Sequence, residues 1–435
     1  MTSTIPTPVG DRLRPTPAQL RWQQLRLGTF VHYGLNTFHG KEWSDGTLPP
    51  SSFDPTALDA RQWARTAREA GSRYLVLTAK HHDGFCLWPT ATTSYGVVSS
   101  PWRGGRGDLV EEVAQACADE GLQLGLYLSP WDRSHPAYAD PAAYDEVYCR
   151  QLAELCTRYG ALTELWFDGA GSEGRVYDWA RIMDVVGEHQ PDAMVFNMGR
   201  PTIRWAGNED GIAPDPVDYV VGHSKMSQYT VVTTTFQEAL YLPPECNVSL
   251  HRGWFWHPQA EAKTVDHLMA VWYRSVGRGG NLLLNVPPDT RGLVAEGDVE
   301  RLREWTARRE ELFGRPVEVD VVPSSEAGDE DEVRTVSLTL PTGTRLDHLE
   351  LREELSGGQR VTSYVVRAGD RVVAAGDRVG AQRVLVTQPL TTDRLEVELH
   401  GRGAGLVGAT AWDTGGAQVP GLPEGYRAPT DYPED

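Results

Sequence analysis

The feature that most constrains the fold is a repeated unit in which a short apolar run ends in polar residues and a stretch with helical spacing follows. This alternation is typical of βα units, in which helices cover parallel strands. The runs predicted as strands are Leu27–Tyr33, Arg73–Ala79, Leu122–Leu128, Thr163–Asp168, Met194–Asn197 and Leu282–Val286. The stretches predicted as helices are Pro55–Glu69, Asp108–Glu120, Pro141–Tyr159 and Tyr177–Glu188.

The spacing of these runs indicates which parallel fold they form. Strand starts recur roughly every 30–50 residues over about 310 residues, which favours a (β/α)₈-like barrel of the TIM type over an open doubly wound sheet. The sequence has no Gly-rich phosphate-binding turn, so nothing in it supports a dinucleotide-binding domain.

The composition of the chain changes near residue 314. Of its 14 tryptophans and 9 phenylalanines, only Trp412 lies beyond that point. There, apolar residues alternate with charged ones, as in Val317–Val321, and glycine pairs mark turns. We therefore predict a barrel domain at residues 1–314, which would carry any catalytic site, and a β-sandwich of roughly 7–9 short strands at residues 315–435.

Charge and cysteine content argue against several classes of function. The 41 basic and 60 acidic residues give a net charge of -19, so neither nucleic acid nor a membrane surface is an expected partner. The five cysteines lack C-x-x-C spacing and predict buried free thiols rather than disulfides or a zinc site. The N-terminus has no apolar signal-peptide core, so we expect a cytoplasmic protein, secreted only if a leader was removed.

Polar and aromatic residues that are unusual at the end of a buried run follow most of the predicted strands. In a barrel of parallel strands, functional side chains gather at the carboxyl ends of the strands, so these residues are expected to meet. They are His32 after the first strand, His81 and His82 after the second, Tyr127 and Trp131 at the third, Asp168 at the fourth, and Arg204, Trp205 and Glu209 beyond the fifth.

Asp168 and Glu209 are the candidate catalytic carboxylates. Taken singly, Asp168 also suits a turn or a helix cap, and Glu209 also suits a solvated loop. Together, two carboxylates from different strand ends predict cleavage of a glycosidic bond, because that reaction needs a nucleophile and an acid/base, and sugars stack their apolar faces on indoles. The surrounding tryptophans are Trp43, Trp88, Trp131, Trp166 and Trp205.

Two other classes of function remain open. His32, His81, His82 and Asp168 offer a nitrogen and oxygen ligand set for a metal-dependent hydrolase, although no H-x-H or H-E-x-x-H spacing occurs. Neighbouring residues on a strand point to opposite sides, so the two adjacent histidines could share one ion only beyond the strand end. The other open class is a non-catalytic sugar-binding protein that has the barrel fold but has lost the activity.

At these residues the sequence resembles the α-L-fucosidase family of retaining glycoside hydrolases, glycoside hydrolase family 29. The resemblance implies a barrel followed by a β-sandwich, a fucosylated oligosaccharide as partner, and no metal or organic cofactor; it leaves the oligomeric state open. The matching segments are Phe30–Gly34, Lys41–Trp43, Lys80–Phe85, Trp166–Gly169, Arg204–Glu209 and Gly253–His257.

The resemblance also implies roles for individual residues. Asp168 matches the nucleophile of the family, and Glu209 falls at the acid/base position of the subgroup that cleaves α-1,3/1,4-linked fucose, with Glu245 as a second candidate. Arg204 is a candidate partner of the nucleophile, with Arg200 as a competitor. The residues implied to hold the fucose hydroxyls and ring are His32, Glu42, Trp43, His81, His82, Tyr127 and Trp166, and Trp254 is a candidate for the subsite of the leaving sugar.

The expected reaction is hydrolysis of terminal α-1,3/1,4-linked L-fucose from oligosaccharides or glycoconjugates by an exo-acting, retaining enzyme. In a retaining enzyme the two carboxyl groups stand about 5–5.5 Å apart. Asp168 would form a covalent intermediate, and Glu209 would first donate and then accept a proton.

Overall fold

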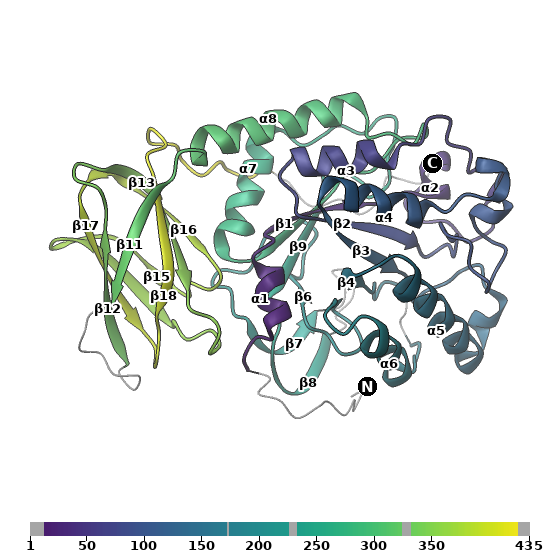
Figure 1. The fold of residues 1–435 in the computed structure, drawn as a ribbon, viewed down its shortest axis with the longest axis horizontal. Coiled ribbons are helices and arrows are strands. Elements are labelled where there is room, and N and C mark those ends of the chain that lie inside the picture. The colour runs from purple at the N-terminus through teal and green to yellow at the C-terminus, as the bar shows by residue number, and fades with distance from the viewer. Residues whose placement is uncertain (1–12, 172–173, 226–232, 324–331, 425–435) are drawn as a thin grey trace.

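The computed structural model describes residues 13–171, 174–225, 233–323 and 332–424. Its larger part is a sheet of eight parallel strands in the order β5-β4-β3-β2-β1-β10-β9-β6 (Figure 1). An isolated parallel bridge between Phe196 and Ile203 links the two edges, so the sheet is a nearly closed barrel. The strands are β1 (Leu27–Val31), β2 (Tyr74–Lys80), β3 (Gln123–Leu128), β4 (Leu162–Trp166), β5 (Met194–Phe196), β6 (Arg204–Trp205), β9 (Pro244–Ser249) and β10 (Asn281–Asn285).

Side chains of the barrel strands alternate between the barrel interior and the surrounding helices. On β4, Leu165 belongs to the large cluster under the helices, whereas Trp166 belongs to a smaller cluster to which seven of the eight strands contribute. This period of two is the geometry of a strand with both faces buried. The interior cluster consists of Trp22, Phe30, Tyr74, Val76, Tyr127, Trp166, Met194, Phe196, Ile203, Trp205 and Leu283.

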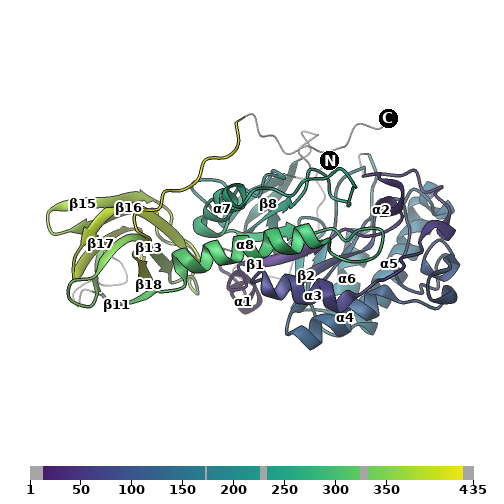
Figure 2. The ribbon, with the colours of Figure 1, turned by 90° about the horizontal axis from the view of Figure 1, so that it is seen from above.

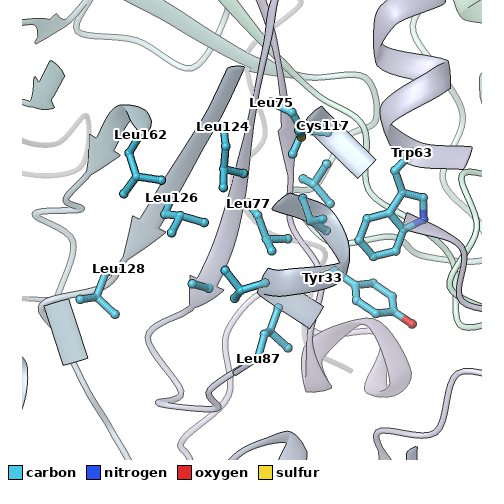
Figure 3. Packing of buried hydrophobic residues seen from close by; sticks show 14 of the residues in the cluster. Tyr33, Trp63, Leu75, Leu77, Leu87, Cys117, Leu124, Leu126, Leu128 and Leu162 are labelled. Atoms are coloured by element: carbon cyan, nitrogen blue, oxygen red, sulfur yellow. The ribbon is translucent and has the colours of Figure 1, made fainter. Parts of the chain in front are cut away.

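The helices cover the outside of the barrel. The four helices predicted from the sequence each begin directly after an aspartate whose carboxylate accepts hydrogen bonds from backbone N–H groups of the first turn: Asp59, Asp108, Asp140 and Asp178. Figure 3 shows the resulting core, in which Leu75 and Leu77 of β2 and Leu124 and Leu126 of β3 lie near Trp63 and Cys117 of the covering helices. The helices are α1 (Pro17–Gln23), α2 (Leu35–His39), α3 (Ala60–Glu69), α4 (Leu109–Glu120), α5 (Pro141–Arg158), α6 (Trp179–His189), α7 (Val265–Arg274) and α8 (Glu296–Phe313).

The second part of the chain is an antiparallel sheet of eight strands that forms a sandwich with its own core, in the order β15-β14-β17-β12-β11-β18-β13-β16. Its first strand begins four residues after α8 ends at Phe313. The predicted fold class, a (β/α)₈-like barrel followed by an all-β sandwich, is confirmed. The strands are β11 (Val317–Pro323), β12 (Val333–Thr339), β13 (Arg345–Glu353), β14 (Ser363–Ala368), β15 (Arg371–Asp377), β16 (Arg383–Thr391), β17 (Arg394–His400) and β18 (Leu406–Trp412).

Specific polar contacts join the sandwich to the barrel. In Figure 2 the sandwich lies at the end of α8, beside α7. The Tyr273 hydroxyl on α7 is 2.8 Å from Nε2 of His348 on β13, and the Trp412 indole donates a hydrogen bond to the Phe313 carbonyl. These contacts place the sandwich against the barrel, where α7 and α8 meet it.

Several elements were not predicted. Strands β6 and β9 have no strand pattern in the sequence. β6 has only two residues, and β9 begins at a proline and carries Glu245 and Asn247 on its inward face. Helices α7 and α8 and the hairpin of β7 (Val220–Lys225) and β8 (Thr233–Tyr241) were also missed. Short 3₁₀ helices occupy Pro50–Ser52, Val97–Ser99, Trp102–Gly105, Pro136–Ala139 and Val276–Arg278.

Two predictions about the chain as a whole can be compared with the structure. All five cysteines are buried and free, as the sequence predicted. Within the described residues, no helix has both the length and the apolar composition that crossing a membrane requires.

Candidate active site

Asp168 lies two residues beyond the end of β4, at the carboxyl ends of the barrel strands. Its Oδ1 accepts a hydrogen bond from the Ala170 amide at 2.9 Å, and its Oδ2 accepts one from the Tyr127 hydroxyl at 3.1 Å and lies 3.5 Å from Nε2 of His82. Burial would raise the pKa of Asp168, but the contacts with His82, Ala170 and Tyr127 outweigh it and hold the pKa below its usual range. The side chain is 25% exposed, so an ionised carboxylate remains accessible at the barrel mouth.

The two adjacent histidines lie beyond the end of β2. The register of β2 against β3 shifts between Thr78 and Lys80, and this irregularity directs the Lys80 side chain outward to Asp132. The strand then ends, and the rings of His81 and His82 lie side by side with centroids 4.2 Å apart. The alternation that would have separated the two rings therefore does not apply to them.

His82 is oriented by Ser129. The Ser129 hydroxyl is 2.7 Å from Nδ1 of His82 and donates to the Trp131 carbonyl at 2.8 Å. Because a hydroxyl has one proton and a carbonyl only accepts, Nδ1 is the donor to Ser129. This arrangement directs Nε2 of His82 at Asp168, and the ring packs against Trp43 and Trp131.

His32 and His81 are neutral histidines at the same mouth. Burial lowers the pKa of His32 to about 3, although its hydrogen bond to Asn285 opposes this shift. The Asn285 amide oxygen, 2.8 Å from Nδ1 of His32, can only accept, so Nε2 of the neutral ring carries the lone pair. Burial also lowers the pKa of His81, whose Nδ1 has no hydrogen-bond partner among the described residues. Nδ1 of His81 is shielded from solvent, so the Nε2 atoms of the two rings are the ones that can serve sugar hydroxyls.

Glu42, Trp43 and Trp254 come from two loops that are joined to each other. The Glu42 carboxylate accepts a hydrogen bond from the Trp254 amide at 2.7 Å and is also 3.4 Å from the Phe255 amide. Asn285 donates to the Trp254 carbonyl, and the Trp254 ring lies 5.2 Å from His32. The structure thus brings Trp254 to the histidines, and Glu42 holds the loop that carries it.

Glu209 lies in a loop that follows β6. Trp205, the last residue of β6, points into the barrel, where its indole donates a hydrogen bond to Asn247 at 2.6 Å. Asn208 fixes the loop, because its side chain donates to the Ile212 carbonyl and accepts from the Asp210 and Ile212 amides. Glu209 is half-buried within this fixed loop.

Arg204 is not a partner of Asp168, contrary to the prediction. Arg204 and Trp205 are neighbours on one strand and face opposite sides, so the inward position of Trp205 directs Arg204 outward. Its guanidinium donates hydrogen bonds to the carbonyls of Trp205 and Asp218. The competing candidate, Arg200, forms an ion pair with Asp184 on α6.

Two further residues lie away from the barrel mouth. Trp88 is fully buried in the core under the helices, where its indole donates to Glu154 of α5. Glu245, the second acid/base candidate, is fully buried inside the barrel, where its two oxygens accept hydrogen bonds from Trp166 and Tyr74. A proton donor must touch the leaving group, and Glu245 in this position cannot.

The predicted metal ligands do not form a set suited to a metal ion. Among the described residues, no three His, Cys, Asp or Glu side chains converge in a way that could hold one. His32 and His82 donate their Nδ1 protons to Asn285 and Ser129, and Nε2 of His82 faces Asp168.

Three residues of the site were missed by sequence reasoning: Asn285, Ser129 and Asn247. Asn285 is the last residue of β10 and the next-to-last of the predicted strand Leu282–Val286, so the strand-end rule that found the histidines also applies to it. Ser129 directly follows another predicted strand. Asn247 lies on β9, which has no strand pattern in the sequence, so no pattern could have placed this residue at the site.

The fold and the site define a class of protein. An accessible carboxylate among histidines and indoles at the mouth of a (β/α)₈-like barrel is typical of a glycoside hydrolase that works without a nucleotide cofactor. Polar and aromatic side chains gathered in this way suit a sugar ring better than they suit an extended apolar ligand.

The comparisons with known proteins specify the family. The family model described as Alpha-L-fucosidase matches residues 47–308. Alpha-L-fucosidase 1 of Arabidopsis thaliana is 36% identical over 85% of this chain and 81% of its own length. A relative from Oryza sativa subsp. japonica is 43% identical over 72% of this chain, and the match spans 62% of the rice protein.

Solved structures agree in fold. A structure described as SpGH29 superposes with a TM-score of 0.84 at 32% identity, covering 92% of this chain and 98% of that one. A GH29 fucosidase of Ruminococcus gnavus, solved in complex with fucose, has a TM-score of 0.77 at 28% identity over 94% of this chain and 96% of its own. The chain belongs to the α-L-fucosidase family, glycoside hydrolase family 29.

Proposed function

We propose that the protein is an exo-acting, retaining α-L-fucosidase that hydrolyses terminal α-1,3/1,4-linked L-fucose from oligosaccharides or glycoconjugates. The sugar follows from the family, and the R. gnavus relative was solved with fucose bound. The observation that carries the mechanism is Asp168, which is kept ionised by Tyr127, His82 and the Ala170 amide at the barrel mouth. The linkage follows from the match of Glu209 to the acid/base position of the α-1,3/1,4 subgroup.

The reaction proceeds by double displacement. In the first step a carboxylate oxygen of Asp168 bonds to the anomeric carbon, the glycosidic bond breaks, and Glu209 gives its proton to the leaving sugar oxygen. In the second step Glu209 takes a proton from water, the water oxygen bonds to the anomeric carbon, and the ester bond to Asp168 breaks. Two inversions return α-L-fucose.

The remaining residues of the site hold the sugar. The neutral rings of His32 and His81 present nitrogen atoms to fucose hydroxyls, and the Tyr127 hydroxyl and His82 orient the nucleophile. Trp43, Trp166 and Trp254 offer indole faces to the apolar side of the ring. Glu42 fixes the Trp254 loop. Each carboxylate oxygen has two lone pairs, so Glu42 can also accept a hydrogen bond from a fucose hydroxyl.

The experiment compares release of free fucose from matched α-1,2- and α-1,3/1,4-fucosylated oligosaccharides by wild type and by Asp168→Ala. We expect release by wild type alone, faster from α-1,3/1,4 linkages, with the variant retaining the wild-type melting temperature within a few degrees. NMR of the first product should show the α anomer. β-Fucose as the first product would overturn retention, and fucose binding without release would point to the non-catalytic alternative.

A further inference from the structure

Two buried glutamates meet inside the barrel below the catalytic carboxylate. Glu164 lies on β4 and Glu245 on β9, strands that are not neighbours in the sheet, and both side chains are 0% exposed. Their carboxyl groups interact inside the barrel, and burial together with the charge of Glu245 raises the pKa of Glu164. The proposed mechanism uses neither of them.

A hydrogen bond between two carboxyl groups requires a proton, because carboxylates only accept. The other donors to the pair are neutral: the Trp22 indole to Glu164, and the Trp166 indole and Tyr74 hydroxyl to Glu245. The second oxygen of Glu164, Oε1, is buried and has no hydrogen-bond donor among the described residues, so a proton held by the pair would serve this oxygen. Two uncompensated anions in such a place would cost several kcal/mol, so the pair holds one proton and one negative charge.

The barrel is shaped to hold this layer. A Cβ on Gly28 of β1 would lie 2.4 Å from the ring of Tyr74, and one on Gly125 of β3 would lie 3.3 Å from Cβ of Glu164 and 2.9 Å from Val76. Both glycines therefore leave space on the inner face of the barrel that the tyrosine and the glutamate fill. Side chains larger than hydrogen at these positions would displace the layer.

The pair is connected to the nucleophile through aromatic side chains. Glu164 and Trp166 face the barrel interior from β4, and Asp168 continues this alternation two residues beyond the strand end. Glu164 is the deepest of the three residues, and Asp168 lies at the barrel mouth. The Trp166 indole, fixed by Glu245, stacks on Tyr127 with centroids 5.4 Å apart and on Phe196 at 3.9 Å. Tyr127 in turn donates to Asp168.

We propose that Glu164 and Glu245 are positioning residues, a proton-sharing acid pair that fixes Trp166 and, through Tyr127, the direction of the Asp168 carboxylate. The inference rests on the proposed function for its catalytic consequence, whereas the shared proton itself depends only on the structure. Without the pair, the Trp166 indole and the Tyr74 hydroxyl would lose their acceptor, and the wall beside the nucleophile would shift.

Replacing Glu164 or Glu245 by leucine, which cannot form hydrogen bonds, or by glutamine, which can, tests the proposal. Glu245→Leu removes the acceptor of both aromatic residues, and a displacement of about 1 Å at a reacting group can cost about 100-fold. We expect its kcat/KM to fall about 10- to 100-fold, and equally for an activated aryl fucoside and a natural oligosaccharide, because a misplaced nucleophile affects both. Glu164→Gln supplies an amide N–H in place of the shared proton and should rescue most of the activity that Glu164→Leu loses.

Infrared spectroscopy detects the shared proton independently of enzymatic activity. Infrared spectra at neutral pH should show the C=O stretching band of protonated, buried carboxylic acids in wild type. This band should weaken in Glu164→Gln and in Glu245→Gln, and Glu353→Gln measures the part of it that belongs to Glu353. A wild-type protein that shows the band but releases no fucose would overturn the proposed function and leave the acid pair standing.

The matched control is Glu353→Gln, at a buried glutamate of the sandwich that accepts hydrogen bonds from three backbone amides. It should keep wild-type kcat/KM, and its melting temperature shows the effect of burying an amide elsewhere. Wild-type activity in Glu245→Leu, no loss of the infrared band in the glutamine variants, or a larger loss on the natural substrate than on the aryl fucoside would each overturn the proposal. If the leucine variants do not fold, the glutamine variants and the infrared band decide it.

Discussion

Two hydrogen-bond donors and the ring of His82 converge on Asp168, and together they favour its ionised state at the barrel mouth. Ala170 lies in the turn after β4, Tyr127 lies on β3, and His82 lies in the segment after β2. Burial by itself would favour the protonated acid. The reactivity of this carboxylate therefore depends on single contacts that substitutions can remove one at a time.

Tyr127→Phe removes one of these donors. A hydrogen bond to a charged group is worth about 1.5–3 kcal/mol, which corresponds to about 1–2 pKa units. Asp168 reacts as the carboxylate, so raising its pKa moves the acidic limb of kcat/KM to higher pH, and we expect a shift of about 1 unit. The pH profile with an activated aryl fucoside measures it. Tyr95→Phe, whose hydroxyl donates to the Leu48 carbonyl, is the control and should leave the limb in place.

Glu209→Ala tests the proton donor. A good leaving group needs little protonation, so the variant should lose about 10²–10⁴-fold in kcat/KM on a natural oligosaccharide and much less on an activated aryl fucoside. Steady-state rates on the two substrates give the ratio. Equal losses on both would assign the proton transfer to another group.

At the scale of the element, the end of β2 decides which side chains reach the site. The register shift before Lys80 directs this lysine under α5, where its ammonium contacts Asp132, Tyr144 and Gln151. Asp132 in turn accepts hydrogen bonds from the Ser134 and His135 amides and orders the loop that follows β3. One buried ion pair thus supports the loop that contains Trp131.

Lys80→Met should destabilise this arrangement. Both members of the pair are almost fully buried, and removing one partner leaves an uncompensated charge, so we expect the free energy of unfolding to fall by about 3–5 kcal/mol. Urea denaturation measures the loss. Arg61→Met breaks the exposed pair with Asp119 and should cost less than about 1 kcal/mol. A similar loss in both variants would show that burial of the pair is unimportant.

At the scale of the whole molecule, the stability of the sandwich against the barrel depends on buried polar groups. Glu353 on β13 ties together the loops that face Tyr219 of the barrel by accepting from the Arg360, Val361 and Gly380 amides. Burial raises the pKa of Glu353 to about 7, although these amides oppose the shift.

The raised pKa of Glu353 has a defined effect on stability. The unfolded chain ionises this group near pH 4.5 and the folded protein near pH 7, so its stabilising contribution is complete below pH 4.5 and is lost as pH rises to about 7. Two and a half pKa units correspond to about 3 kcal/mol. Glu353→Gln should therefore show a free energy of unfolding that falls less between pH 5 and pH 8 than that of wild type. Glu238→Gln, at an exposed glutamate, should reproduce the wild-type slope.

Local sequence patterns were sufficient to predict several of the strands and helices of this molecule. The first predicted strand and the helices after Asp108 and Asp140 correspond to β1, α4 and α5, because apolar periodicity and aspartate caps act within a few residues. The aromatic break near residue 314 coincides with the end of α8. Strand β9 gave no such signal, because its inward face is polar.

The βα order, the change to a sandwich and the strand-end residues that include Asp168 follow from the sequence, since each of these depends on neighbours along the chain. The outward direction of Arg204, the inward direction of Trp205 and the burial of Glu245 beside Glu164 follow from the fold alone. A side chain's direction is set by its strand's register in the barrel, and a buried carboxyl's partner comes from a distant strand. Neither can be read from local spacing, because both depend on contacts that form only when the barrel closes.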